Sequence, residues 1–84
     1  MITVLYFAWL RDRIGQAEES IELPDGVVTV EALIDSLCQR SPGHAAAFAQ
    51  RDAIRAAVNQ VFAAPEDKLS AGDEVAFFPP MTGG

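Results

Sequence analysis

The stretch Thr29-Val30-Glu31-Ala32-Leu33-Ile34-Asp35-Ser36-Leu37-Cys38 decides the fold. Its apolar residues recur at i, i+3, i+4, i+7 and i+8, which places them on one stripe of an α-helix: Val30, Leu33, Ile34, Leu37 and Cys38. We expect Thr29 to cap this helix, because its hydroxyl can accept a free N–H of the first turn. Glu31 and Asp35 follow early in the helix, where its dipole favours acids. Ser41-Pro42-Gly43 then ends it.

The segments before the helix predict two strands. Ile2–Ala8 is a continuous apolar run with one polar member, so both faces of this strand are apolar. Such a strand lies centrally in a sheet, and we expect one face on a helix and part of the other left for a partner. The faces alternate, with Ile2, Val4, Tyr6 and Ala8 on one and Thr3, Leu5, Phe7 and Trp9 on the other. Residues 10–15 form a polar connection, residues 18–23 a half-exposed strand, and Pro24-Asp25-Gly26 a turn.

After the helix, the pattern predicts a second short helix at 44–50 and strands at 54–58, 61–63 and 74–78. The order is therefore β-β-α-α-β-β-β, an α+β chain. Its first and last strands can pair in parallel at the centre of a mixed sheet, because a right-handed crossover through the long helix satisfies the connection rule. One long helix packed across such a sheet is the β-grasp, or ubiquitin-like, architecture.

Composition narrows the class of protein. Eighty-four residues, half of them apolar, make one small domain with a real core. One cysteine excludes an internal disulfide, and with one histidine it cannot supply the four ligands of a structural zinc site. The net charge of −6 repels phosphate backbones, so we expect no nucleic-acid partner. No apolar run could span a membrane, and Met1-Ile2-Thr3-Val4 lacks signal-peptide features, so we expect no membrane partner and a cytoplasmic location.

The body of the chain shows no evident catalytic apparatus. Cys38 belongs to the apolar stripe, so we interpret it as a buried structural residue rather than a nucleophile. His44, beside a Pro-Gly break, is interpreted as a surface residue at a helix start rather than a general base. The carboxylates are interpreted as scattered, solvated charges, and the sequence has no glycine-rich phosphate loop. We therefore expect no metal site and no bound cofactor.

The last residues, Phe77-Phe78-Pro79-Pro80-Met81-Thr82-Gly83-Gly84, form an arm on this body. The two prolines stop the strand, because proline has no N–H for a ladder. Residues 79–84 reach on the order of 20 Å when extended, at ~3.3 Å each, which is enough to enter another protein's active site. The terminal glycines lack a Cβ and can pass through a narrow channel. We therefore divide the chain into a domain, residues 1–78, and an extended, flexible tail, residues 79–84; an ordinary frayed terminus is the alternative.

The group that distinguishes this chain chemically is the α-carboxylate of Gly84. A carboxylate is inert to nucleophiles until it becomes a mixed anhydride. Adenylation by ATP makes that anhydride, and a sulfur or amine nucleophile can then displace AMP. The chain would be a carried substrate rather than an enzyme on its own.

Residues 72–84, Gly72-Asp73-Glu74-Val75-Ala76-Phe77-Phe78-Pro79-Pro80-Met81-Thr82-Gly83-Gly84, closely resemble the C-terminal signature of the MoaD family, the small subunits of molybdopterin synthase. Weaker support falls in the expected order along the chain: Val4-Leu5-Tyr6-Phe7-Ala8 with Arg11, Thr29-Val30-Glu31-Ala32-Leu33, and Ala57-Val58-Asn59-Gln60. The resemblance implies a sulfur carrier in molybdenum cofactor biosynthesis. A ubiquitin-activating-enzyme-like adenylyltransferase would use ATP to adenylate Gly84, and a sulfur donor protein would supply the sulfur of a thiocarboxylate.

The resemblance also implies how the tail is used. Pro79, Pro80, Met81, Thr82 and Gly83 would insert into the large subunit of molybdopterin synthase, in a heterotetramer of two small and two large subunits. The sulfur on Gly84 would pass to cyclic pyranopterin monophosphate, and two transfers would build the molybdopterin dithiolene. The large subunit would supply the catalytic side chains. Family members typically carry valine at the position of Met81, a conservative departure that bears on the fit of the tail.

The apolar first strand and the pair Phe77-Phe78 suggest a hydrophobic docking face. We predict that the partner interface includes Phe7, Trp9, Arg11 and Phe78. Complete burial of all three aromatic residues would contradict this prediction.

Three other functions remain open from the sequence. One is a sulfur carrier of another pathway, such as the thiamine-thiazole carrier, although Phe77-Phe78-Pro79-Pro80 speaks against it. Another is a ubiquitin-like modifier joined to lysines through Gly84. The third is a plain interaction domain with an inert tail.

Overall fold

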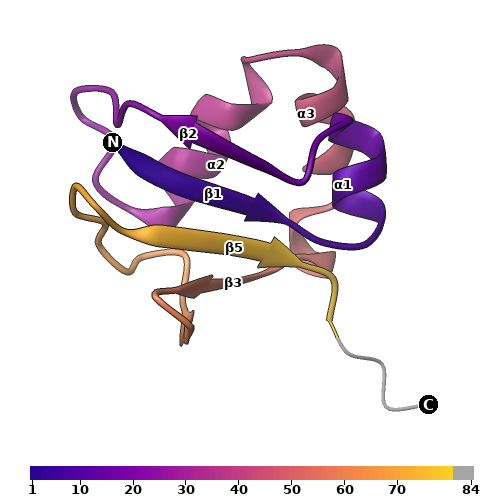
Figure 1. Ribbon diagram of the computed structural model, residues 1–84. Helices are drawn as coiled ribbons and strands as arrows, with labels where there is room; N and C mark the ends of the chain where they lie inside the picture. Colours follow the sequence, from indigo (N-terminus) through magenta and orange to yellow (C-terminus); the bar gives the residue numbers. More distant parts are fainter. Residues whose placement is uncertain (81–84) are drawn as a thin grey trace.

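The computed structural model describes residues 1–80 and shows a five-stranded mixed sheet with helices packed behind it (Figure 1). The strand order is β2-β1-β5-β3-β4, with β1 and β5 parallel at the centre and the other neighbours antiparallel. The strands are β1 (Ile2–Tyr6), β2 (Glu18–Ile21), β3 (Arg55–Val58), β4 (Val61–Ala63) and β5 (Glu74–Phe78). The β-grasp prediction is confirmed. The predictions for Met81, Thr82, Gly83 and Gly84 lie outside the described residues.

The helices connect the strands on one side of the sheet. They are α1 (Trp9–Ile14), α2 (Val30–Cys38) and α3 (Pro42–Ala47), followed by the 3₁₀ turn η1 (Arg51–Ala53). The long helix α2 begins as predicted, since the side chain of Thr29 accepts the N–H of Ala32 at 3.1 Å. Within residues 1–80, none of the helices has the length and apolar character needed to cross a membrane.

Several boundaries differ from the prediction by one to three residues, and two of the differences have clear local reasons. Strand β1 ends at Tyr6 rather than Ala8, because Ala8 adopts φ 55° and ψ −132° and turns the chain into α1. Trp9 therefore lies on α1 and not on the second face of the strand. Helix α3 begins at Pro42 instead of His44, because Ser41 caps it and proline fits the first helical position.

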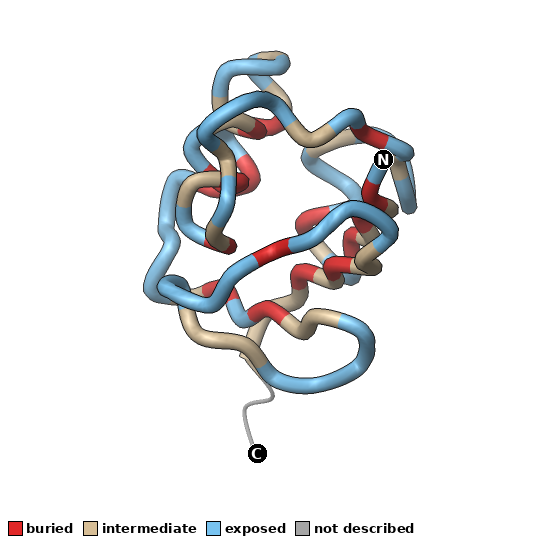
Figure 2. Tube along the Cα trace, turned by 90° about the vertical axis from the view of Figure 1, so that its left-hand side faces the viewer, coloured by how far each residue is buried: buried red, intermediate tan, exposed pale blue. Residues whose placement is uncertain are grey.

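The core lies between α2 and the inner face of the sheet. Strands β1 and β5 bury alternate residues, and Phe77 of β5 is 0% exposed. Its ring meets that of Phe48 edge-on, with centroids 5.1 Å apart. Figure 2 shows the buried segments gathered in the interior, while the loops around them are exposed. Cys38, predicted to be a buried structural residue, is partly buried at the end of α2.

The β3–β4 hairpin is tied to β5 by one side chain. Asn59 and Gln60 both have positive φ, 51° and 69°, the conformation of a tight two-residue turn whose twist matches the strands. The Asn59 amide donates to Asp73 and accepts the N–H of Glu74, each at 3.0 Å. These bonds fix where β3 stands against β5, and so which residues meet at the end of β5.

Candidate functional site

The predicted tail begins where the central strand β5 ends. This strand ends at Phe78, and the partly buried Pro79 and Pro80 follow it. Prolines at this point cannot extend the ladder to either neighbouring strand. The body thus holds residue 78 firmly at the place from which the predicted tail departs, while the division at 79–84 stays a prediction.

A row of apolar residues crosses the face of the sheet opposite the helices. Register places Leu5 of β1 beside Ala76 of β5, Ala76 beside Ala57 of β3, and Ala57 beside Phe62 of β4. Paired residues point to the same face, which is opposite to the face that carries Val75 and Phe77. We call this surface the open face; its apolar members are Leu5, Phe7, Ala57, Phe62, Ala76 and Phe78.

Two hollows flank Phe78 on the open face. One, of about 430 Å³, is lined entirely by apolar residues: Phe7, Ala8, Ala76, Phe78 and Pro79. The other, of about 440 Å³, lies toward β4 and is lined by Arg55, Ala56, Phe62, Ala63, Phe78 and Pro80. Because small alanines sit between large rings, each hollow can receive a side chain of another protein. Phe78 thus forms a ridge at the root of the tail.

The predicted interface residues divide into two groups. Phe7 and Phe78 line one hollow together, and Phe7 is 47% exposed. Trp9 packs partly buried against the core from α1, with the guanidinium of Arg13 4.5 Å from its ring centre. Arg11 is exposed on the same helix, and its nearest carboxylate is that of Asp12 at 4.0 Å. None of the three predicted aromatic residues is fully buried, so the outcome that would have contradicted the docking face is not observed.

Phe62 is a member of the open face that sequence reasoning missed. Its side chain is 81% exposed, and its ring lies 6.0 Å from that of Phe78, centroid to centroid. The strand at 61–63 was expected, but the face that Phe62 occupies depends on its pairing with Ala57. An exposed phenylalanine beside other apolar groups marks an interaction surface better than an isolated one does.

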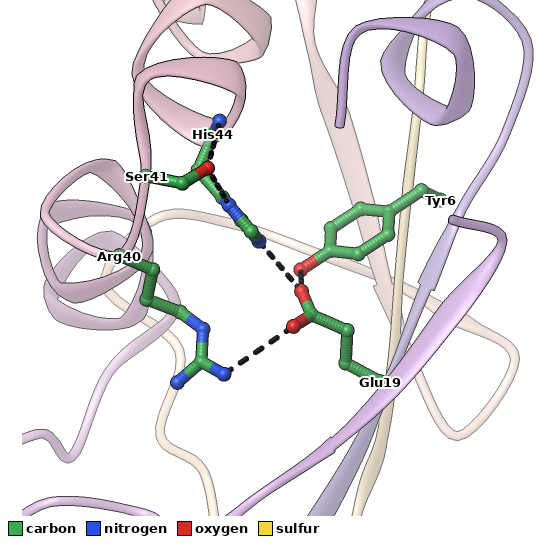
Figure 3. Close-up of polar contacts among 5 residues, drawn as sticks. All are labelled: Tyr6, Glu19, Arg40, Ser41 and His44. Carbon is green, nitrogen blue, oxygen red and sulfur yellow. Dashed lines mark hydrogen bonds and ion pairs between the residues drawn. The ribbon is translucent and has the colours of Figure 1, made fainter. Parts of the chain in front are cut away.

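A buried polar cluster lies on the helix side of the sheet, away from the open face (Figure 3). The carboxylate of Glu19, on β2, accepts hydrogen bonds from the Tyr6 hydroxyl and from Nε2 of His44, each at 2.6 Å. Arg40 donates to its other oxygen at 3.3 Å, and Ser41 Oγ lies 2.7 Å from Nδ1 of His44. The prediction that His44 lies on the surface is wrong, since it is only 5% exposed. Glu19 likewise is not a solvated charge, because its side chain is 8% exposed.

Burial and hydrogen bonding shift the pKa values in this cluster. Burial raises the pKa of Tyr6 far above its usual range, and its hydrogen bond to the charged Glu19 adds to the shift. Burial alone would raise the pKa of Glu19, but the hydrogen bonds from His44 and Tyr6, with the charge of Arg40, outweigh it and hold this pKa below 4.5. Glu19 is therefore ionised at neutral pH, as an acceptor for three donors.

His44 contacts Ser41 through one ring nitrogen and Glu19 through the other, as the histidine of a serine hydrolase contacts its serine and its acid. Here, however, Ser41 Oγ also accepts the N–H of His44 at 3.1 Å and so caps α3. The cluster also joins β1, β2 and the start of α3 through buried side chains. We therefore interpret it as a structural network that holds α3 on the sheet. Within residues 1–80, no group of three or more His, Cys, Asp or Glu could hold a metal ion.

Comparison with known proteins agrees with this geometry. The model of the ThiS family matches residues 4–84. The chain belongs to the ThiS family. Its resemblance to the small subunits of molybdopterin synthase is also confirmed, because similar proteins are named molybdopterin synthase sulfur carrier subunit. The molybdopterin synthase sulfur carrier subunit of Escherichia coli is 42% identical over 84 residues, which is 100% of each chain.

Solved structures with the same fold include two archaeal proteins. The putative molybdopterin converting factor, subunit 1, of Pyrococcus furiosus superposes with a TM-score of 0.78 at 34% identity, covering 95% of this chain and 97% of that one. SAMP1 of Haloferax volcanii, a small archaeal modifier protein, gives a TM-score of 0.75 at 30% identity, covering 99% and 98%. Both confirm that this ThiS-family chain has the ubiquitin-like β-grasp fold.

Proposed function

We propose that this protein is the sulfur carrier subunit of molybdopterin synthase, with the C-terminal carboxylate of Gly84 as the group that carries sulfur. One observation carries the proposal: relatives of that name match the chain from end to end, at 39% and 42% identity over 84 residues. The fold supports it, because two prolines follow strand β5 directly, beside an exposed apolar face. In this proposal partner proteins bind the body and thereby position the tail.

The proposed chemistry takes place on one main-chain group. An oxygen of the Gly84 carboxylate attacks the α-phosphate of ATP and releases pyrophosphate, in the active site of a ubiquitin-activating-enzyme-like adenylyltransferase. The outer sulfur of a donor protein's persulfide then attacks the acyl carbon and displaces AMP. A thiol next cleaves the sulfur–sulfur bond of the resulting acyl disulfide and forms a disulfide with the donor, which releases the thiocarboxylate. The sulfur goes on to cyclic pyranopterin monophosphate in the large subunit. The small subunit contributes no catalytic side chain and binds no cofactor in this proposal.

The proposed complex contains two small and two large subunits. We place the open face against the large subunit. Its exposed aromatic residues, with hollows lined by alanine between them, resemble the core of a protein–protein interface. Pro79, Pro80, Met81, Thr82 and Gly83 would then enter the active site of the large subunit. In this position the ridge formed by Phe78 directs the tail.

Intact-mass spectrometry tests the proposal directly. The protein is incubated with ATP, the adenylyltransferase and a sulfur donor, and it should gain the oxygen-to-sulfur mass difference at Gly84. The matched control lacks only Gly84. This control should keep its thermal unfolding and its binding to the large subunit, yet neither gain sulfur nor support sulfuration of the pterin. A full-length protein that gains no sulfur contradicts the proposal, and a control that unfolds contradicts the division into body and tail.

A ubiquitin-like modifier is the second candidate, favoured by the match to the modifier protein SAMP1. Both functions use an activated C-terminus, so the product decides between them. Gly84 in isopeptide bonds to lysines of many cellular proteins would favour the modifier. A carrier for another pathway would form the thiocarboxylate but fail to sulfurate the pterin with the large subunit.

A further inference from the structure

Arg55 is a charged residue that lies beside Phe78, at the end of strand β5. It stands opposite Phe78 in the β3–β5 register, so its side chain belongs to the open face. Strand β4 pairs only as far as Ala56, so β3 extends past it at Arg55. The residue is exposed and lines the hollow between Phe62 and Phe78.

Two backbone carbonyls hold the guanidinium of Arg55 in place. Its Nη1 donates to the carbonyl of Asp52 at 2.9 Å and to that of Ile54 at 3.3 Å. All hydrogen bonds of this side chain within residues 1–80 thus use one nitrogen, while a guanidinium carries five N–H donors on three nitrogens. The remaining donors are oriented in advance, so a partner group loses little entropy in using them.

The charge of Arg55 has no counterpart in the body. Arg51 pairs with Asp35 and Arg40 with Glu19, but within residues 1–80 no carboxylate lies within ion-pair distance of Arg55. Covering the open face would remove water from this cation and leave it uncompensated, which is costly unless the covering surface brings an anion. A planar guanidinium with free parallel donors fits a carboxylate best.

We infer that Arg55 is a specificity-determining residue of the docking surface, and that the protein receiving the tail bears an aspartate or glutamate opposite it. The same partner places an apolar side chain in the hollow lined by Phe62, Phe78 and Pro80. This inference rests on the proposed function, which takes the large subunit of molybdopterin synthase as that partner. It adds a charge requirement to the apolar residues of the open face.

Binding of the large subunit to variants of the small subunit tests this inference. Arg55→Glu should raise Kd on the order of tenfold at low salt, and the difference should shrink in 1 M NaCl. Lys68→Glu changes the net charge equally at an exposed position outside the open face, and should stay within about twofold of the parent. Arg55→Lys should recover only part of the affinity, because lysine lacks the planar fork.

The partner's acid is found by reversing charges on the large subunit. One Asp→Arg or Glu→Arg change there should restore binding of the Arg55→Glu variant. If the parent binds the large subunit while the two charge reversals bind equally well, the inference about Arg55 is overturned and the proposed function stands. If the parent forms no thiocarboxylate and does not bind the large subunit, the proposed function fails and takes this inference with it.

Discussion

Replacing Glu19 by alanine should destabilise the fold more than any other change to a charged residue of the buried cluster. The substitution removes the acceptor of the Tyr6 hydroxyl and of Nε2 of His44, both of which lie inside the protein. Each buried donor left without an acceptor costs about 1–3 kcal/mol, so the two together cost about 2–6 kcal/mol. The contact with Arg40 adds little, since that side chain is 43% exposed and water screens its charge. A domain of this size has roughly 4–12 kcal/mol of stability, so the loss is a large share of it.

Urea unfolding followed by circular dichroism measures this cost. The matched control is Glu18→Ala, on the same strand but exposed, which should change the free energy of unfolding by less than about 0.5 kcal/mol. The pKa of Glu19 is lower in the folded than in the unfolded protein, so its stabilising effect is complete above pH 4.5 and is lost as the pH falls through the folded value. The gap between parent and Glu19→Ala should therefore narrow in acid. A variant as stable as the control at pH 7 would refute the structural role of the cluster.

Four further substitutions test the backbone strain at Ala8, the packing of the core and the docking surface separately. Ala8→Gly should raise the free energy of unfolding by about 1 kcal/mol in urea titrations, because glycine adopts φ 55° without strain. Phe77→Ala should lose about 3–5 kcal/mol in the same titrations by opening a core cavity, whereas Phe78→Ala should lose far less and mainly weaken binding. Phe62→Ser should leave stability within about 0.5 kcal/mol and weaken binding of the large subunit in a calorimetric titration, and equal affinity would remove Phe62 from the docking surface.

The fold could be predicted from local patterns because its central elements are locally consistent. Helix α2 carries its own cap and apolar stripe, and the last strand runs over the expected residues 74–78. The pairing of β1 with β5 followed from the two apolar faces of the first strand together with the handedness of crossovers. The end of the first strand before Ala8 was not predicted, because the positive φ of Ala8 is imposed by its neighbours and alanine itself does not favour that conformation.

The polar cluster was missed because its contacts join residues far apart in the chain. Glu19 and His44 are 25 positions apart in the sequence, and each belongs to a residue type that is seldom fully buried. One signal was available: Glu19 shares the parity of Ile21 on the second strand, so period-two alternation already places it on the core face. A carboxylate on an inward position predicts a buried partner, and the single histidine was the candidate to supply it.

Phe77 and Phe78 show how the register of β5 joins stability to function. Phe77 faces inward and packs on Phe48, while Phe78 faces outward beside Phe62. A slip of one residue would exchange the two rings, burying the ridge and exposing the core aromatic. The hydrogen bonds of Asn59 to Asp73 and Glu74 oppose such a slip at the start of β5, and the prolines after Phe78 end the strand at a fixed point. The same contacts that stabilise the sheet therefore determine where strand β5 ends and which residues lie on the open face beside it.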